Sequence, residues 1–169
     1  MQSSGFVIEA LAPAHQRTAF SSGVEALDLY LHKQAGQDAK RHVAAPFILR
    51  QPPENQVLGY YTLSASAIDT RDLPAELAKK MPRYGSLPVI LLGRLAVATS
   101  MKGRGLGEFL LMDGLQRSAR SEIAAMALIV DAKDDKAQAF YQHFNFIPLQ
   151  HQPRRLFLPM STIKALFVD

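Results

Sequence analysis

The chain of 169 residues contains no cysteine. Disulfides, thiolate metal sites and cysteine nucleophiles are therefore excluded. Its five histidines show no metal-ligand spacing, so no metal is expected; they are His15, His32, His42, His143 and His151. No apolar run approaches the roughly 20 residues that span a bilayer, and the amino terminus lacks the basic start and long apolar stretch of a signal peptide. We therefore expect a cytoplasmic protein without membrane attachment.

The composition is that of a folded domain. Hydrophobic residues make up 48% of the chain and charged residues 20%, which suits one globular domain over residues 1–169 with a sizeable core. Neither repeats nor linkers nor low-complexity segments interrupt the sequence. The formal net charge of +4 hints at an anionic ligand or partner, although many basic proteins bind no nucleic acid.

Strands and helices alternate in the hydrophobic pattern. Strands are expected over 5–10, 46–50, 56–68, 89–97, 126–132, 145–149 and 154–160. Helices are expected over 21–42, 72–81, 134–144 and from the glycine-rich segment to about Arg120. Ser22 with Glu25 predicts a capping box for the first helix, and Asp134 predicts a cap for the last. Because antiparallel-type strands come first and a strand–helix–strand–helix–strand run follows, we predict an α/β fold with a mixed sheet.

A glycine-rich segment, "MKGRGLGEFLL", separates an apolar strand from the following helix. Gly103, Gly105 and Gly107 let the backbone approach a ligand, and the N–H groups at a helix start favour a phosphate or diphosphate. Lys102 and Arg104 would add positive charge. A flexible turn is the plain alternative. Two known phosphate motifs do not fit, because no Gly-Lys-[Ser/Thr] follows as in the P-loop and the glycine spacing differs from the dinucleotide-binding Gly-x-Gly-x-x-Gly.

Two segments together resemble the GNAT superfamily of N-acetyltransferases. "LGRLAVATSMKGRGLGEFLL" resembles the acetyl-CoA-binding motif, a buried strand followed by [Gln/Arg]-x-x-Gly-x-[Gly/Ala] and a helix. "VDAKDDKAQAFYQHFNFIPL" resembles the second signature, a strand, a helix carrying Phe-Tyr and the start of a further strand. Lys102 stands where Gln or Arg is usual, and Asn145 stands where Gly is common, although Asn also tolerates the left-handed conformation.

The resemblance implies a fold and a cofactor site. The fold is a single GNAT domain with a mixed, mostly antiparallel sheet that splays apart at the acetyl-CoA site and has flanking helices. The diphosphate would sit on the backbone amides of Lys102, Gly103, Arg104, Gly105, Leu106 and Gly107. The pantetheine arm would pair with the strand edge formed by Leu95, Ala96 and Val97. The thioester would then point into the splay, near Tyr141.

Acetyl transfer to an amine needs a neutral amine, a stabilised oxyanion and a proton for the leaving thiolate. The resemblance makes Tyr141 the general acid, since a phenol with a reference pKa near 10 can protonate a thiolate; helix packing is the plain alternative for this residue. A backbone N–H of residues 95–97 would stabilise the oxyanion.

The strand over 89–97 carries no carboxylate that could act as a general base. This favours an α-amine over a lysine side chain as the acceptor, because an α-amine is partly neutral at neutral pH. Glu54, Glu76 or a water could still act as the base.

The flanking segments resemble one subgroup, the acetyltransferase toxins of bacterial toxin–antitoxin pairs. The entry-helix phrase F-x-x-G-x-x-x-L-D-x-[WY]-L matches at Phe20, Gly23, Leu27, Asp28, Tyr30 and Leu31. "GYYTLSASAI", "GRLAV" and the ending "RRLFLPMSTI" are similar too, so the resemblance covers nearly the whole chain. It implies acetylation of the α-amino group of aminoacyl-tRNA, which stops translation. It also implies a ribbon–helix–helix antitoxin and a homodimer, to which the exposed-looking final strand would contribute.

Several basic residues are candidates for contact with tRNA. They are Lys33, Lys79, Lys80, Arg83 and Arg94. A solvated surface is the ordinary fate of any one of these lysines. Arg94 differs because it interrupts an apolar strand and should face a cleft or an anion. Two other functions remain open on the sequence: acetylation of a small-molecule or protein amine, and non-catalytic sensing of acetyl-CoA through a partner.

Overall fold

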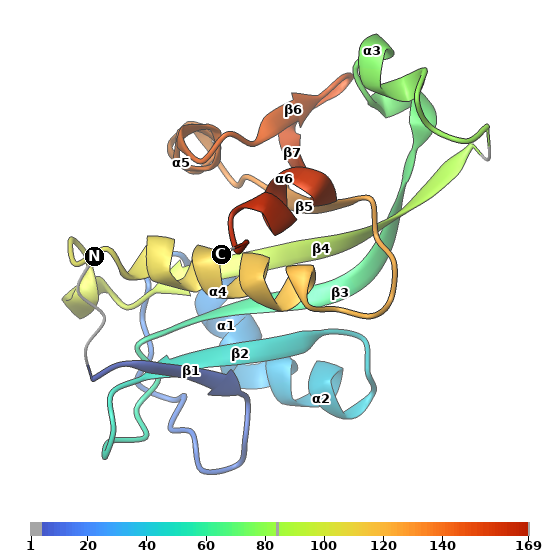
Figure 1. Ribbon diagram of the computed structural model, residues 1–169. Helices are drawn as coiled ribbons and strands as arrows, with labels where there is room; N and C mark the ends of the chain where they lie inside the picture. Colours follow the sequence, from blue (N-terminus) through green and yellow to red (C-terminus); the bar gives the residue numbers. More distant parts are fainter. Residues whose placement is uncertain (1–4, 84, 169) are drawn as a thin grey trace. The chain divides into compact units, whose positions relative to one another are not determined.

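The fold is built on a sheet of seven strands. In the computed structural model, which describes residues 5–83 and 85–168, the strand order is β1-β2-β3-β4-β5-β7-β6 (Figure 1). The strands are β1 (Val7–Ala10), β2 (Ala45–Arg50), β3 (Gly59–Asp69), β4 (Ser86–Val97), β5 (Ala127–Asp131), β6 (Ile147–Leu149) and β7 (Gln152–Pro159). The pair β4–β5 is parallel, whereas β1–β2, β2–β3, β5–β7 and β6–β7 are antiparallel. The predicted mixed, mostly antiparallel α/β sheet is confirmed.

Helical segments connect these strands. They are α1 (Glu25–Leu29), the π-helical η1 (Tyr30–Gln34), α2 (Ala35–Lys40), the 3₁₀ turns η2 (Thr70–Asp72) and η3 (Thr99–Met101), α3 (Ala75–Ala78), α4 (Leu106–Ala119), α5 (Asp135–His143) and α6 (Met160–Ala165). The predicted cap of α5 is confirmed, because the Asp134 carboxylate accepts the N–H of Ala137 at 2.8 Å. The helix α3 is shorter than the predicted helix over 72–81, and α6 has no counterpart in the sequence prediction.

The predicted capping box at the first helix is wrong. Val24 precedes α1, and no side chain caps this end. Ser22 instead bonds to Asp28: its hydroxyl donates to Oδ1 at 2.6 Å, and its backbone N–H donates to the same oxygen at 2.9 Å. Asp28 satisfies two donors of Ser22 at once, so Glu25 is left exposed as an ordinary first-turn residue.

The chain divides into two compact units. The first comprises the chain up to Ser64 together with Arg94–Gly114, and the second comprises Ala65–Gly93 together with the chain from Leu115 onward. The elements β3, β4 and α4 contribute residues to both units.

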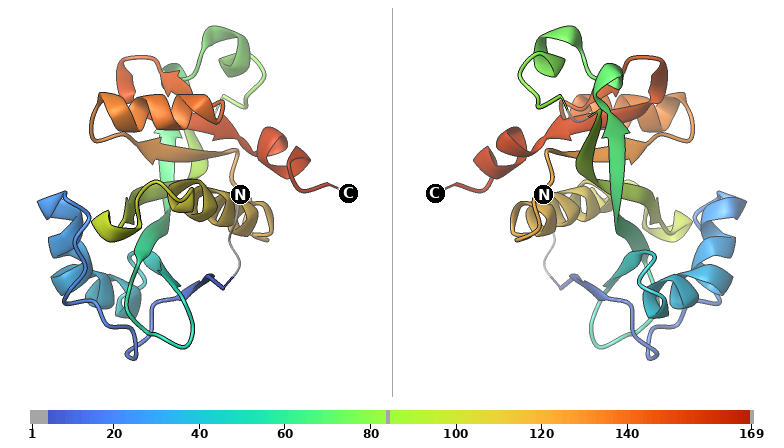
Figure 2. Two further views of the ribbon diagram at one scale, coloured as in Figure 1. Left: turned by 90° about the vertical axis from the view of Figure 1, so that its left-hand side faces the viewer. Right: turned by 90° about the vertical axis from the view of Figure 1, so that its right-hand side faces the viewer.

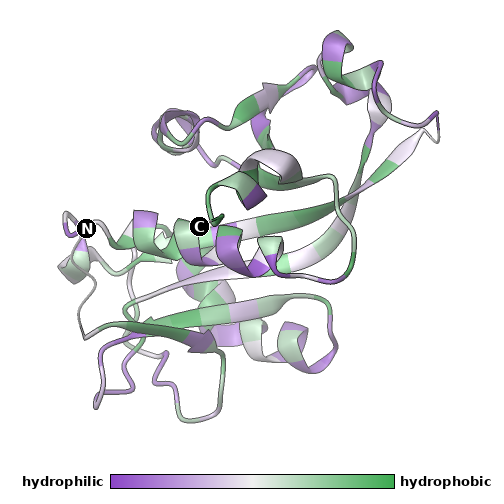
Figure 3. Ribbon diagram, in the orientation of Figure 1, coloured by the Kyte–Doolittle hydropathy of each residue, from purple (hydrophilic) through white to green (hydrophobic). Residues whose placement is uncertain are grey.

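Each unit has its own apolar core. In the first unit, α1, η1 and α2 pack against β2, β3 and β4 (Figures 1 and 2). Its buried members are Phe20, Tyr30, Leu31, Ala35, Ile48, Val57, Tyr60, Ala96 and Ala98. The core of the second unit consists of Ile68, Leu73, Leu87, Val89, Ala127, Ile129, Leu149 and Phe157. Figure 3 shows β2 and β4 mainly in hydrophobic colours, as expected for strands that supply core side chains.

Strand β7 is an interior strand. It lies between β5 and β6, and its Leu158 stands opposite Leu128. Leu156, Phe157 and Leu158 are at most 2% exposed. The expectation of an exposed final strand over 154–160 is therefore wrong. The cause is strand order: β6, which comes earlier in the chain, takes the edge position of the described sheet.

A buried histidine holds β1 to the rest of the first unit. The His15 side chain is 1% exposed, and its Nε2 donates to Glu9 Oε2 at 2.7 Å. Its Nδ1 accepts the backbone N–H of Ala12 at 2.9 Å, so the ring hydrogen lies on Nε2. Arg50 on β2 donates from Nε to the same Glu9 oxygen, also at 2.7 Å. The bonds from Arg50 and then from His15 lower the pKa of Glu9.

Replacement of Glu9 by glutamine is expected to lower the thermal midpoint near neutral pH, because His15 and Arg50 lose their charged acceptor. The pKa of Glu9 is lower in the folded state than its ordinary value of 4.5, so its contribution to stability is complete above that pH and disappears as the pH falls through the folded value. Thermal denaturation of wild type and Glu9→Gln from about pH 3 to 7 measures this. The gap between their midpoints should shrink in acid; a gap independent of pH would contradict the assignment.

Candidate functional site

The glycine turn, residues 102–107, is exposed at the start of α4. Residues 102–105 are exposed, and Gly103 and Gly105 have left-handed φ angles of 82° and 75°. Apart from Gly103 and its two chain neighbours, no heavy atom of the described chain lies within 4 Å of a Cβ built on Gly103, so a ligand can reach the backbone there. The N–H of Phe109 bonds to the carbonyl of Gly105, so the N–H groups of the preceding residues form the donor-rich start of the helix. The turn therefore has the features that favour an anion.

The two cations of the glycine turn play different parts. Lys102 Nζ donates to the carbonyl oxygen of Ser22 at 2.9 Å, and the N–H of Thr99 donates to the carbonyl of Ser21 at 2.9 Å. The Lys102 ammonium thus ties the turn to the segment before α1. Arg104 is exposed and has no ion pair within the described part of the chain. Arg104 is therefore the cation of this turn that has no ion-pair partner within the described part of the chain.

The last residues of β4 extend beyond its register with β5. The parallel pairs run from Ile90 opposite Leu128 to Leu92 opposite Val130, whereas β4 continues to Val97. In this extension, residues 95–97, Ala96 is buried in the first core and its two neighbours are partly exposed. A strand that continues past its partner offers backbone N–H and C=O groups to an extended ligand. The assignment of the pantetheine arm to residues 95–97, which the resemblance implies, stays a prediction.

Tyr141 is the most buried aromatic residue of α5. It is 6% exposed, with ring centroids 5.6 Å from Phe146 and 5.3 Å from Phe140. Phe140 and Phe144 are only partly buried, so Tyr141 packs more deeply than either of them. Burial, followed by the negative charge of Asp131, raises the pKa of Tyr141 above its ordinary value of 10.0. Because its pKa is raised, the phenol is protonated at neutral pH.

Three of the predicted tRNA-contacting residues gather at α3. Lys79, Lys80 and Arg83 follow this helix within the second unit, and all three are exposed. Lys79 Nζ lies 3.6 Å from a Glu76 oxygen, a contact with little strength at this exposure. Lys33 lies on η1 in the first unit and is exposed as well. Lys79, Lys80 and Arg83 thus form a basic surface of the second unit, the α3 surface. Lys33 lies in the first unit and is not part of this surface.

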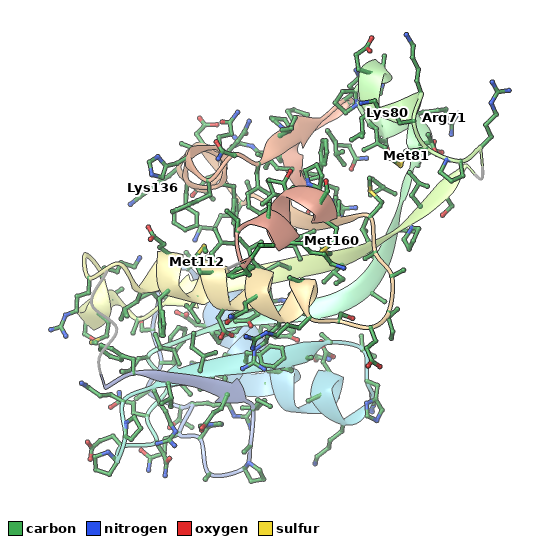
Figure 4. The ribbon with its side chains drawn as sticks, in the orientation of Figure 1. Arg71, Lys80, Met81, Met112, Lys136 and Met160 are labelled. Atoms are coloured by element: carbon green, nitrogen blue, oxygen red, sulfur yellow. The ribbon has the colours of Figure 1, made fainter. Side chains whose placement is uncertain are left out.

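Arg71 is a basic residue of the second unit that the sequence reasoning missed. Figure 4 shows Arg71 and Lys80 at the α3 end of this unit and Lys136 on α5. Arg71 Nη2 lies 2.8 Å from Asp69 Oδ2, and its hydrogen bonds hold the pKa of that carboxyl at about 2. The Asp-x-Arg spacing was the available signal. Because Asp69 neutralises it, Arg71 adds less net charge to the surface than the neighbouring lysine.

Arg94 stacks on an aromatic ring. Its Cζ lies 3.6 Å from the ring centroid of Tyr30, and this ring is stacked on Tyr60 at 6.2 Å. The Tyr30 hydroxyl donates to Asp38 Oδ2 at 2.8 Å. Burial and this bond raise the pKa of Tyr30 to about 12. The sequence predicts a cleft or an anion at Arg94, but no local pattern could show a tyrosine partner so far away in the chain.

Two further features bear on the class of site. Within residues 5–83 and 85–168, no helix is long and apolar enough to cross a membrane. The same residues hold no group of three or more His, Cys, Asp or Glu side chains that could bind a metal ion.

The sequence matches the model of the acetyltransferase (GNAT) family over residues 11–146. The chain belongs to the GNAT acetyltransferases. The exposed glycine turn, residues 102–107, lies within the range that matches this family. Asn145 keeps the left-handed conformation expected where the family pattern has glycine, with a φ of 72°.

Similar GNAT proteins include toxins. A tRNA-acetylating toxin of Mycobacterium tuberculosis is 37% identical over 161 residues, 94% of this chain and 95% of the relative. A tyrosine-to-phenylalanine mutant of KacT has a TM-score of 0.91 and 31% identity, with coverage of 97% of this chain and 100% of that chain. AtaT complexed with acetyl-methionyl-tRNAfMet has a TM-score of 0.89 and 34% identity, with coverage of 96% and 99%. AtaT has also been solved with the carboxyl terminus of the antitoxin AtaR and acetyl-CoA, at a TM-score of 0.84 and 30% identity over 98% of this chain and 100% of that chain.

Proposed function

We propose that this chain is the toxin of a toxin–antitoxin pair, which transfers the acetyl group of acetyl-CoA to the α-amino group of aminoacyl-tRNA and so stops translation. The observation that carries the proposal is the exposed glycine turn, with two left-handed glycines directly before α4. The similarity to a tRNA-acetylating toxin and to AtaT in complex with acetyl-methionyl-tRNAfMet supports the acceptor.

In this proposal the glycine turn holds the diphosphate of acetyl-CoA. The backbone N–H groups of residues 102–107 and the start of α4 bind the phosphate oxygens, and Arg104 adds charge from the surface. Lys102 contributes by fixing the turn to Ser22. The pantetheine arm pairs with residues 95–97, and a backbone N–H there stabilises the oxyanion. The acetyl-CoA in an AtaT structure supports this choice of co-substrate.

The acceptor amine attacks the thioester carbonyl, the carbon–sulfur bond breaks, and Tyr141 gives its proton to the departing sulfur. The amine loses its own proton to water or to a base. The absence of a carboxylate on β4 favours an acceptor whose amine is already partly neutral, which an α-amino group next to an ester is. Aminoacyl-tRNA has such a group. A lysine side chain, with a reference pKa near 10.4, would be almost entirely protonated.

The proposed partners follow from the acceptor and from the relatives. The α3 surface of the second unit, with Lys79, Lys80 and Arg83, binds tRNA phosphates, and Lys33 is a separate candidate for phosphate contact in the first unit. A ribbon–helix–helix antitoxin masks the enzyme; the AtaT complex with the carboxyl terminus of AtaR supports an antitoxin of some kind. We also propose a homodimer, working in the cytoplasm where charged tRNA is found.

A direct assay tests the function. Purified protein is incubated with radiolabelled acetyl-CoA and a mixture of charged tRNAs, and the label is followed into tRNA. Label is expected on aminoacyl-tRNA, in an alkali-labile ester-linked form, and not on uncharged tRNA. If labelled tRNA is absent while small amines or proteins become acetylated, the acceptor is wrong although the enzyme class holds. Binding of acetyl-CoA without any transfer would show a sensor.

A further inference from the structure

We propose that Arg94 binds the 3′-terminal phosphodiester of the acceptor tRNA through the edge of its guanidinium group. The inference rests on the proposed function and deepens it, because it names one side chain for the end of the acceptor that carries the amino acid. It starts from the position of Arg94 on β4, from its stacking on Tyr30, and from the hydrogen-bond donors that this stacking leaves unused.

The position of Arg94 in β4 directs it to the helix-covered face of the first unit. Alternate strand residues share a face, so Arg94 points to the same side as Ala96. Ala96 belongs to the core cluster that contains Tyr30 and Tyr60. A charged side chain at the border of an apolar core is costly unless its charge is satisfied. The strand therefore holds this cation where an ordinary core residue would pack.

The ring of Tyr30 fixes the guanidinium from one face only. The ring itself is held by its stacking on Tyr60 and by the bond of its hydroxyl to Asp38. The Asp38 carboxylate accepts from Gln34 Nε2 at 2.9 Å through its other oxygen, and it acts on Arg94 through its charge and not through a hydrogen bond. Within the described part of the chain, no hydrogen bond or ion pair engages the Arg94 guanidinium beyond this stacking. Its in-plane N–H groups remain available, and their fork matches the oxygens of a phosphate.

Two sources could supply that phosphate, acetyl-CoA or the acceptor tRNA. The phosphates of acetyl-CoA are assigned to the glycine turn at residues 102–107. Arg94 directly precedes residues 95–97, to which the thioester end of the pantetheine arm is assigned. The anion that comes near the thioester with the acceptor amine is the phosphodiester of the 3′-terminal adenosine, because the amino acid is esterified to that nucleoside. We therefore assign the contact to the tRNA.

A pair of minimal acceptors isolates this contact. Aminoacyl-adenosine lacks the phosphodiester, whereas aminoacyl-cytidylyl-adenosine contains it. Arg94→Gln should lower kcat/KM by about tenfold or more on the dinucleotide and by less than about twofold on the nucleoside, with the KM for acetyl-CoA unchanged. Arg94→Lys keeps the positive charge but lacks the planar guanidinium group. On the dinucleotide, its loss of kcat/KM should therefore be smaller than that of Arg94→Gln. Arg120→Gln, the same charge change at an exposed residue after α4, is the matched control and should behave as wild type.

A binding measurement gives a readout independent of turnover. The affinity for N-acetyl-aminoacyl-tRNA is measured at several salt concentrations, and loss of one phosphate contact should reduce the slope of log K against log salt by about 0.7 to 1. Equal losses on both minimal acceptors, or an unchanged salt slope, would overturn the proposal. A raised KM for acetyl-CoA would assign the phosphate to the coenzyme instead. If wild type binds acetyl-CoA but acetylates neither the minimal acceptors nor full-length aminoacyl-tRNA, the proposed function itself fails, and the assignment of Arg94 fails with it.

Discussion

Replacement of Tyr141 by phenylalanine is expected to lower kcat for acetyl transfer by about 10²- to 10⁴-fold, while the affinity for acetyl-CoA changes by less than about twofold. Phenylalanine keeps the ring that packs against Phe146 and Phe140, so α5 retains its contacts. Only the hydroxyl is lost, and with it the proton for the leaving thiolate. Steady-state kinetics with aminoacyl-tRNA measure kcat, and calorimetry measures the affinity for acetyl-CoA.

The pH dependence of kcat gives a second test of the role of Tyr141. Burial and the Asp131 carboxylate raise the pKa of Tyr141, so the phenol keeps its proton throughout the neutral and mildly alkaline range. Any fall in kcat below about pH 10 should therefore come from another group and should persist in Tyr141→Phe. A buried environment beside the ring also raises the pKa of the leaving thiol, because it disfavours the charged thiolate. Proton transfer from the phenol to sulfur therefore remains feasible.

A second buried tyrosine supplies the control. The Tyr61 hydroxyl donates to Asp113 Oδ2 at 2.6 Å within the first unit. Tyr61→Phe also removes a buried phenolic hydroxyl, here one that makes a hydrogen bond, and should cost about 1 to 3 kcal/mol of stability with little change in kcat. If Tyr141→Phe retains nearly the wild-type kcat, or if both variants lose activity in parallel with their thermal midpoints, the role of Tyr141 as general acid is wrong.

Features set by short stretches of chain could be predicted from the sequence. The cap of α5 depends on Asp134 and on an N–H three residues later, so the local pattern is sufficient. The glycine turn is another example, because positive φ angles at Gly103 and Gly105 follow from the residue type at the end of a strand. The buried strands over 89–97 and 126–132 are long apolar runs, which few other structures accommodate.

Features set by residues far apart in the chain could not be predicted. Ser22 satisfies the first-helix pattern with Glu25, yet Asp28 offers a better acceptor once the chain turns back on itself. The position of β7 inside the sheet depends on the pairing of β6 with its outer edge. The apolar pattern of β7 does not predict this pairing, because it is the same for an edge strand and an interior strand. The stacking of Arg94 on Tyr30 joins β4 to η1, and neither local sequence contains a sign of the other.

Valine in place of Gly105 is expected to weaken the binding of acetyl-CoA by about tenfold or more, the effect of losing one charged hydrogen bond. Gly105 has a φ of 75°, which a β-branched residue cannot adopt without strain. Relief of that strain turns the peptide groups of the glycine turn, so that their N–H groups no longer converge on one diphosphate. Calorimetric titration with acetyl-CoA measures the loss.

Gly85 separates loss of the site from backbone strain. It has a φ of 78° and lies in the connection before β4, outside the glycine turn. Apart from Gly85 and its two chain neighbours, no heavy atom of the described chain lies within 4 Å of a Cβ built on it. Gly85→Val should therefore lower the thermal midpoint about as much as Gly105→Val but leave the affinity for acetyl-CoA unchanged. Equal affinities in the two variants would contradict the assignment, since strain is then the common cause. A difference confined to Gly105→Val would mean that the direction of the amides in residues 102–107, and not general stability, determines whether the coenzyme binds.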